Sequence, residues 1–78
     1  MITIILVFKG DYQKTLGFLK ADGSQANKAS PDGATPLMYA SINGQLSLIQ
    51  LLIEYGADID ARDYENGWTA LMQATYYG

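Results

Sequence analysis

The sequence predicts an all-α fold built from a repeated helix–turn–helix unit, and two observations carry this prediction. First, residues 33–44 and 67–78 resemble one another, with the same Gly, Thr, Leu, Met, Ala and Gly positions at a spacing of about 34 residues. Such a repeat is typical of a solenoid, in which each unit buries its apolar face against a neighbouring unit. Second, apolar side chains between the turns recur at helical spacing. We therefore expect a stack of about 2.5 repeats.

The boundaries follow from the turn residues. We expect a single domain over residues 1–78, divided into a degenerate repeat (1–29), a complete repeat (30–62) and a half repeat (63–78). In the complete repeat, residues 30–33 form a turn, Thr35 caps a short helix that has Pro36 at its first position, and Gly44 ends that helix. The sequence thus predicts two short helices per unit, joined to the next unit by short β-turn loops.

The second helix of the complete repeat, expected over residues 46–55, is apolar on nearly every side. A helix of this kind needs cover on every side, so we expect it to be enclosed by its partner and by both neighbouring repeats. Residues 12–21 read as the equivalent helix upstream, with Asp22 and Gly23 ending it. The second turn, residues 63–67, is one residue longer than the first, and we expect the extra residue at the exposed loop tip.

Residues 2–8 form a run that is apolar except for Thr3. The run is too short to span a bilayer, which needs about 20 apolar residues, and it lacks the features of a signal peptide. Periodicity does not separate a buried helix from a strand here, and we favour a helix. We expect no membrane span. The absence of cysteine fits a reducing compartment, so we expect an intracellular protein, cytoplasmic or nuclear.

The composition excludes most catalytic chemistry. The 78 residues include no cysteine and no histidine, which removes thiolate nucleophiles, imidazole bases and nearly every zinc site. An enzyme would have to work with carboxylates alone, and we expect no catalytic residue, cofactor or metal. The acidic side chains of residues 58–65 are alternately spaced in an extended arm, which favours a solvated rim over a calcium loop. A binding protein is the better expectation.

Charge is unevenly distributed around the net value of −3. Residues 1–28 contain more lysine than aspartate, whereas Arg62 is the single cation against six carboxylates in residues 29–78. An acidic surface argues against nucleic acid, because affinity for phosphates comes largely from lysine and arginine. A protein partner with a basic or apolar surface is favoured.

These motifs resemble those of the ankyrin repeat family. The resemblance rests on residues 32–40, followed by Asn43-Gly44, Leu51-Leu52 and residues 56–61, and it is weak over residues 1–9. It implies an ankyrin-repeat solenoid that binds proteins without catalysis. It also implies that Asn27 and Asp60 each close a turn by bonding backbone.

Three departures from the family pattern matter, and one of them is Thr69-Ala70 in place of Thr-Pro. Met38 and Met72 stand where the family usually has a histidine that bonds the adjoining loop, so those loops are expected to be held less firmly. The half repeat has a first helix and no second one, which should leave residues 51–53 without a covering neighbour. Either the chain is a fragment, or a second copy covers that face and the protein is a homo-oligomer.

The resemblance also implies a concave binding surface made of turn tips and the exposed ends of first helices. We expect the clustered aromatics Tyr64, Trp68, Tyr76 and Tyr77 to anchor a partner, or to pad a thin core. The complete set of expected protein-binding residues is Pro31, Asp32, Ala34, Ile42, Asn43, Arg62, Tyr64, Glu65, Asn66, Trp68, Tyr76 and Tyr77.

Overall fold

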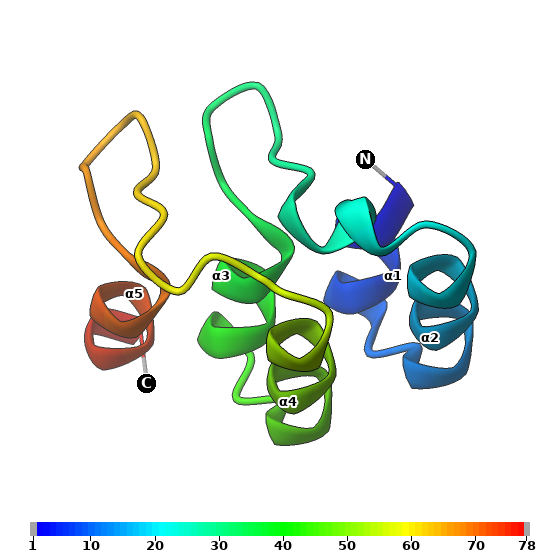
Figure 1. The fold of residues 1–78 in the computed structure, drawn as a ribbon. Helices are drawn as coiled ribbons and strands as arrows, with labels where there is room; N and C mark the ends of the chain where they lie inside the picture. The colour runs from blue at the N-terminus through cyan, green and yellow to red at the C-terminus, as the bar shows by residue number, and fades with distance from the viewer. Residues whose placement is uncertain (1, 78) are drawn as a thin grey trace.

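Helices make up all the regular secondary structure in residues 2–77, the part of the chain that the computed structural model describes. They are α1 (Ile2–Lys9), α2 (Tyr12–Ala21), the 3₁₀ helix η1 (Gly23–Asn27), α3 (Pro36–Ile42), α4 (Leu46–Glu54) and α5 (Ala70–Tyr77). Helices α1, α3 and α5 form one row, and α2 and α4 form a second row beside it (Figure 1). The all-α solenoid predicted from the sequence is confirmed, and residues 2–9 are helical rather than extended.

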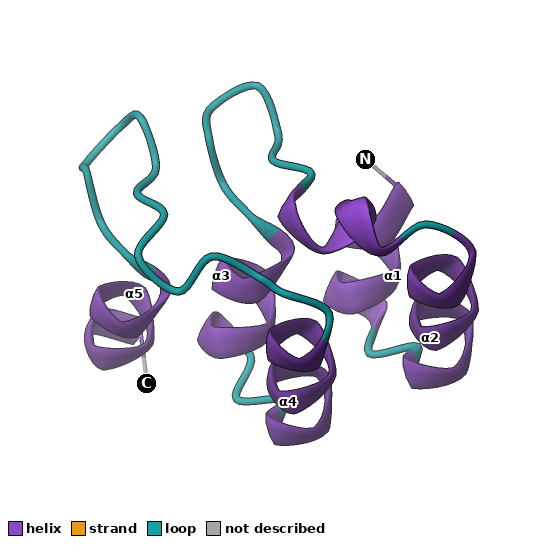
Figure 2. Ribbon diagram, viewed as in Figure 1, coloured by secondary structure: helices purple, strands orange, loops and turns teal. Residues whose placement is uncertain are grey.

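Two long loops rise from the same side of the helix rows (Figure 2). We call residues 28–35 the first finger loop and residues 61–69 the second finger loop. The Ser30 N–H donates to the Ala34 carbonyl at 2.8 Å, and the Asp63 N–H donates to the Trp68 carbonyl at 3.0 Å. The equivalent bond therefore spans one more residue in the second loop, where the extra residue was predicted.

Local chemistry explains where α3 begins. The Thr35 hydroxyl accepts the Met38 N–H at 3.3 Å, while Pro36 occupies the first turn, where a missing N–H costs no intrahelical bond. The Met38 sulfur in turn accepts the Thr35 N–H at 3.4 Å. Met38 stands where the family pattern has histidine. Its sulfur thus provides one hydrogen bond to Thr35, at the base of the first finger loop.

The core lies between the two rows of helices, and its largest fully enclosed side chains include Val7, Leu19, Met38 and Leu52. The expectation that α4 is covered on every side is wrong. Leu48, Leu51 and Leu52 are buried, but Leu46 and Ile53 are exposed. Leu51 and Leu52 are also buried, contrary to our expectation for residues 51–53, because they belong to the core cluster, and of these three residues Ile53 alone is exposed.

The turn after α2 contains an element that the sequence reading missed, the 3₁₀ helix η1. Asn27, at its end, bonds backbone as expected, but not to close its own turn. Its amide nitrogen donates to the Gly56 carbonyl at 2.9 Å, and its amide oxygen accepts the Asp58 N–H at 2.7 Å. Asn27 therefore ties the first helix pair to the end of α4 in the next one.

Candidate functional site

A groove lies between the two finger loops and continues onto the facing sides of α3 and α5. It holds a pocket of about 150 Å³. Seven of the expected binding residues line this pocket: Asp32, Ala34, Ile42, Glu65, Asn66, Trp68 and Tyr77. Residues far apart in the sequence thus converge on one concave surface.

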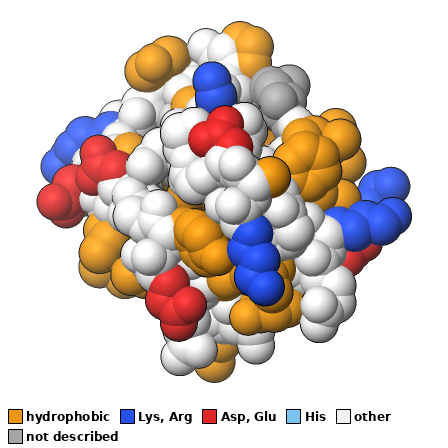
Figure 3. Space-filling view, turned by 45° about the vertical axis from the view of Figure 1, so that its right-hand side comes forward, with side chains coloured by type: hydrophobic (Ala, Val, Ile, Leu, Met, Phe, Trp, Pro, Cys, Tyr) orange, Lys and Arg blue, Asp and Glu red, His pale blue; other side chains and the backbone are white. Residues whose placement is uncertain are grey.

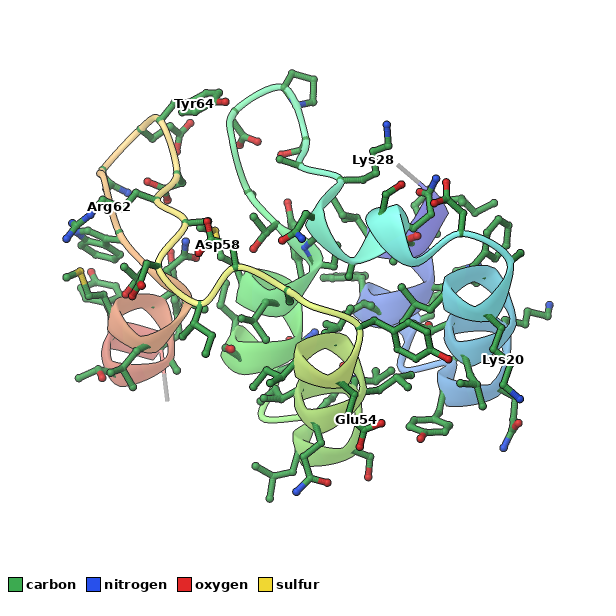
Figure 4. All side chains as sticks on the ribbon, viewed as in Figure 1. Lys20, Lys28, Glu54, Asp58, Arg62 and Tyr64 are labelled. Carbon is green, nitrogen blue, oxygen red and sulfur yellow. The ribbon has the colours of Figure 1, made fainter. Side chains whose placement is uncertain are left out.

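The other five expected residues lie outside the pocket. Pro31 is exposed on the first finger loop, and Asn43 is exposed at the end of α3. Arg62 points away from the first finger loop (Figure 4) and donates to the Gly67 carbonyl at 2.7 Å. Tyr76 lines a separate apolar face of α5. Tyr64 is exposed near the tip of the second finger loop.

Tyr64 joins the two finger loops rather than clustering with the other aromatic residues. Its N–H donates to the Asp32 carbonyl at 2.9 Å, and its ring lies against Gly33. Figure 4 shows the ring directed toward the first finger loop. The expectation of a single four-residue aromatic cluster is therefore wrong for Tyr64.

The remaining three aromatics do form a cluster. The ring centroids of Trp68 and Tyr76 are 5.1 Å apart, and those of Tyr76 and Tyr77 are 5.0 Å apart. A second pair, Phe8 and Tyr39, meets edge to face with centroids 6.3 Å apart. Aromatic side chains are therefore present along the concave row from α1 to α5, which offers large contact areas at low entropic cost.

Sequence reasoning missed Met38, Tyr39, Asp63 and Gln73, which also line the pocket. Asp63 is the most informative of them. Its Oδ1 atom accepts the N–H groups of Asn66 and Trp68 at 2.9 and 3.2 Å, and its Oδ2 atom accepts from the Gln73 amide at 3.1 Å. An aspartate that opens a tight loop often bonds backbone in this way, and that signal could have identified Asp63 as the residue that shapes the second finger loop.

The groove carries negative charge on both finger loops. Asp32 accepts a short hydrogen bond from the Ser30 hydroxyl, which holds the pKa of Asp32 below its usual 3.8 against the opposing effect of burial. Glu65 and Asp63 stand on the opposite loop. By contrast, positive and negative groups are mixed on the side of the molecule toward α2 (Figure 3).

The described part of the chain contains neither a candidate metal site nor a candidate membrane-spanning helix. Within residues 2–77, no group of three histidine, cysteine, aspartate or glutamate side chains is placed to hold a metal ion. None of the helices there is long and apolar enough to span a bilayer.

Paired helices in two rows, linked by finger loops over a concave groove, define a helical repeat protein. A family profile described as "Ankyrin repeats (3 copies)" matches residues 3–78. The chain belongs to the ankyrin repeat family. The modules of this family typically mediate protein–protein interaction and are not enzymes.

Several curated proteins are similar to the chain. It is 49% identical over 69 residues, 88% of its length, to mouse ankyrin repeat and SAM domain-containing protein 6, of which the match covers 8%. It is 38% identical over 63 residues, 81% of its length, to mouse protein phosphatase 1 regulatory subunit 27, of which 40% is covered. An IkB-like protein of African swine fever virus is 35% identical over 66 residues, 85% of this chain and 28% of the viral protein. The chain thus spans a small part of the first of these relatives.

Proposed function

We propose that this chain binds a protein partner in the groove between its finger loops and that the partner presents a basic or apolar segment. The observation that carries the proposal is the convergence of seven expected contact residues on one concave pocket. Its aromatic side chains offer the kind of contact that dominates interface energies.

The chemistry of the groove supports a lysine- or arginine-containing segment. Asp32 and Glu65 place carboxylates on opposite finger loops, and Trp68 and Tyr77 line the same pocket. A guanidinium or ammonium group can pair with a carboxylate while its stem packs on an aromatic face. The positive charge of Arg62 does not repel such a partner from the groove, because Arg62 lies on the outer side of its loop and donates to the Gly67 carbonyl.

The test of this site combines Trp68→Ala with Tyr77→Ala, both of which line the pocket, and measures affinity for a candidate partner by calorimetry. We expect at least a tenfold loss, because the double variant removes two of the aromatic anchors. Gln50→Ala, in the outer helix row, serves as the matched control and should bind normally. A folded double variant with unchanged affinity would rule out the proposed site.

Self-association is a second candidate function, favoured by apolar side chains that remain exposed on α4 and α5. Burial of apolar surface is worth about 25 cal/mol per Å², so two copies could gain by covering these helices. Sedimentation velocity over a hundredfold range of concentration separates the candidates. A species that stays monomeric throughout would remove this second function.

We also propose an intracellular location, cytoplasmic or nuclear. The proposal is supported by the absence of cysteine, which suits a reducing compartment. Imaging of the tagged protein in cells tests it, and a secreted product would contradict it.

A further inference from the structure

Asparagine precedes glycine at two places in the chain, Asn43-Gly44 and Asn66-Gly67. Both asparagines are exposed. In such a pair the backbone nitrogen of the glycine can attack the asparagine side chain, because glycine has no β-carbon to hinder the approach. The fold holds that nitrogen differently at the two places.

The first pair lies at the end of α3, where the helix restrains it. The Gly44 N–H donates to the Ser41 carbonyl at 3.2 Å, so removal of its proton also costs a hydrogen bond. Asn43 has ψ of −1°. At that angle the next nitrogen stands about 120° around the Cα–C bond from the β-carbon, whereas a five-membered ring brings the two nearly into line. Ring closure at Asn43 therefore requires the end of α3 to unwind.

The second pair lies in the second finger loop, outside any helix (Figure 2). Its neighbours are held, since the N–H groups of Asn66 and Trp68 both donate to Asp63 Oδ1. Within residues 2–77, however, the Gly67 N–H donates to no acceptor. Nothing lies within 4 Å of a β-carbon built at Gly67. The attacking nitrogen is therefore neither hydrogen-bonded nor crowded.

The extra residue of the second finger loop explains this difference. In the first finger loop the equivalent glycine, Gly33, donates its N–H to the Ser30 carbonyl at 2.8 Å. Asp63 is the counterpart of Ser30, but three residues rather than two separate it from the glycine. The turn bond of the first loop is consequently absent at Gly67.

We propose that Asn66 deamidates spontaneously in the folded chain, while Asn43 is protected. The Gly67 nitrogen loses its proton to solvent and bonds to Asn66 Cγ. The bond from Cγ to the amide nitrogen breaks, and that nitrogen takes a proton from water and leaves as ammonia. Water then opens the resulting succinimide ring at either carbonyl, which gives aspartate or isoaspartate. The co-reactant is water, and the proposal holds whether or not a partner binds the groove.

The reaction changes the groove, because Asn66 lines its pocket together with Glu65 and Trp68. Both products replace a neutral amide with a carboxylate. Isoaspartate also adds one carbon atom to the main chain between the nitrogens of residues 66 and 67. The segment that lengthens is closed at both ends on one residue, since the Asp63 N–H donates to the Trp68 carbonyl at 3.0 Å and Asp63 Oδ1 accepts the Trp68 N–H. We therefore expect isoaspartate to loosen Trp68 from Asp63.

The test incubates the folded chain at neutral pH and body temperature and follows both sites by trypsin digestion and mass spectrometry. Trypsin cuts after lysine and arginine, so Asn43 falls in peptide 29–62 and Asn66 in peptide 63–78. Deamidation replaces NH by oxygen and raises the mass, whereas isomerisation of an aspartate does not. We expect Asn66 to react at least tenfold faster than Asn43. In guanidinium chloride the two rates should agree within threefold, because the fold no longer separates the two pairs.

Two variants assign the site and its consequence. Asn66→Gln should abolish the mass gain of peptide 63–78, whose other amide side chain is Gln73. Asn66→Asp reproduces the new charge without the additional carbon atom. Hydrogen exchange of the Trp68 amide should accelerate at least tenfold in the isoaspartate form, separated by chromatography from the aged chain, and less than threefold in Asn66→Asp.

The proposal fails if the ratio of the two rates in the folded chain is below tenfold. It also fails if Asn66 reacts more than tenfold slower in the folded chain than in guanidinium chloride, since the loop would then protect it as α3 protects Asn43. A mass gain that persists in Asn66→Gln would place the reaction at Gln73 and overturn the assignment. Equal exchange of the Trp68 amide in the isoaspartate form and in Asn66→Asp would overturn the loosening of the loop.

Discussion

The ring of Tyr64 lies so close to Gly33 that a β-carbon on residue 33 would stand 2.7 Å from Tyr64 Cδ1. Gly33 also has φ of +82°, a conformation that L-amino acids with a side chain rarely adopt. The adjacent Tyr64 N–H to Asp32 carbonyl bond joins the same two loops. The spacing of the finger loops, and with it the width of the groove, depends on this contact.

Gly33→Ala should destabilise the chain by more than Gly44→Ala. Both glycines have positive φ, so each substitution costs about 1–2 kcal/mol in backbone strain. Only at Gly33 does the new methyl group meet another side chain, because nothing lies within 4 Å of a β-carbon at Gly44. Urea unfolding of both variants measures the difference. In a Tyr64→Ala background the two costs should become equal, and a persistent excess at Gly33 would show that the ring is not its cause.

Asn27→Ala should lower the free energy of unfolding by about 1–3 kcal/mol, since it removes two hydrogen bonds of about 0.5–1.5 kcal/mol each. Asn27→Asp keeps the acceptor for the Asp58 N–H but turns a carboxylate toward the Gly56 carbonyl. It should therefore also destabilise the chain, and less so below pH 4, where aspartic acid becomes protonated and can donate. Thermal unfolding at pH 7 and pH 3.5, each compared with wild type, measures both effects.

Asp63→Ala should loosen the second finger loop and cost roughly 2–3 kcal/mol, because three donors lose a charged acceptor. Asp63→Asn is the matched control. Its oxygen can still accept from Asn66 and Trp68, and the Gln73 amide can rotate to present its oxygen to the new NH₂ group. Hydrogen exchange of the Asn66 and Trp68 amides should accelerate strongly in the alanine variant and slightly in the asparagine variant. Equal protection in both would contradict this role.

Ser30→Ala should raise the pKa of Asp32 toward 3.8, because the Ser30 hydroxyl is the main cause of its depression. A carboxylate with a lowered pKa in the folded state contributes stability that is present above 3.8 and is lost as pH falls through the folded-state value. Titration of the Asp32 carboxyl carbon by NMR measures the shift. Asp22, whose pKa is lowered chiefly by the Ser24 hydroxyl, serves as the internal control and should not change.

Much of the fold was predictable because local chemistry and tertiary structure agree. Threonine is favoured at the N-cap and proline at the first helical position, as at Thr35 and Pro36, and the repeat between residues 33–44 and 67–78 defines the spacing of the units. The extra residue in the second finger loop could be placed for the same reason. These features depend on neighbours in the sequence.

The predictions that were wrong concern contacts between neighbouring repeats. Periodicity shows that α4 is apolar on nearly every side, but not that Ile53 is exposed while Leu52 is fully buried. The partners of Asn27 lie 29 and 31 residues away, and no local pattern identifies them. For the site, the turn residues were expected to form the binding surface, yet the Tyr64 ring lies against Gly33 and Arg62 points away from the first finger loop.

The central claim, that the groove between the finger loops receives a protein partner, is tested most directly by site-specific photo-crosslinking in cells. A photoreactive amino acid is placed at Ile42, which lines the groove, or at Gln50, which lies between α2 and α4 in the outer row. The account predicts a discrete crosslinked partner from position 42 that Glu65→Lys abolishes, and none from position 50. A crosslink from position 50 alone, or one from position 42 that Glu65→Lys leaves unchanged, would contradict it.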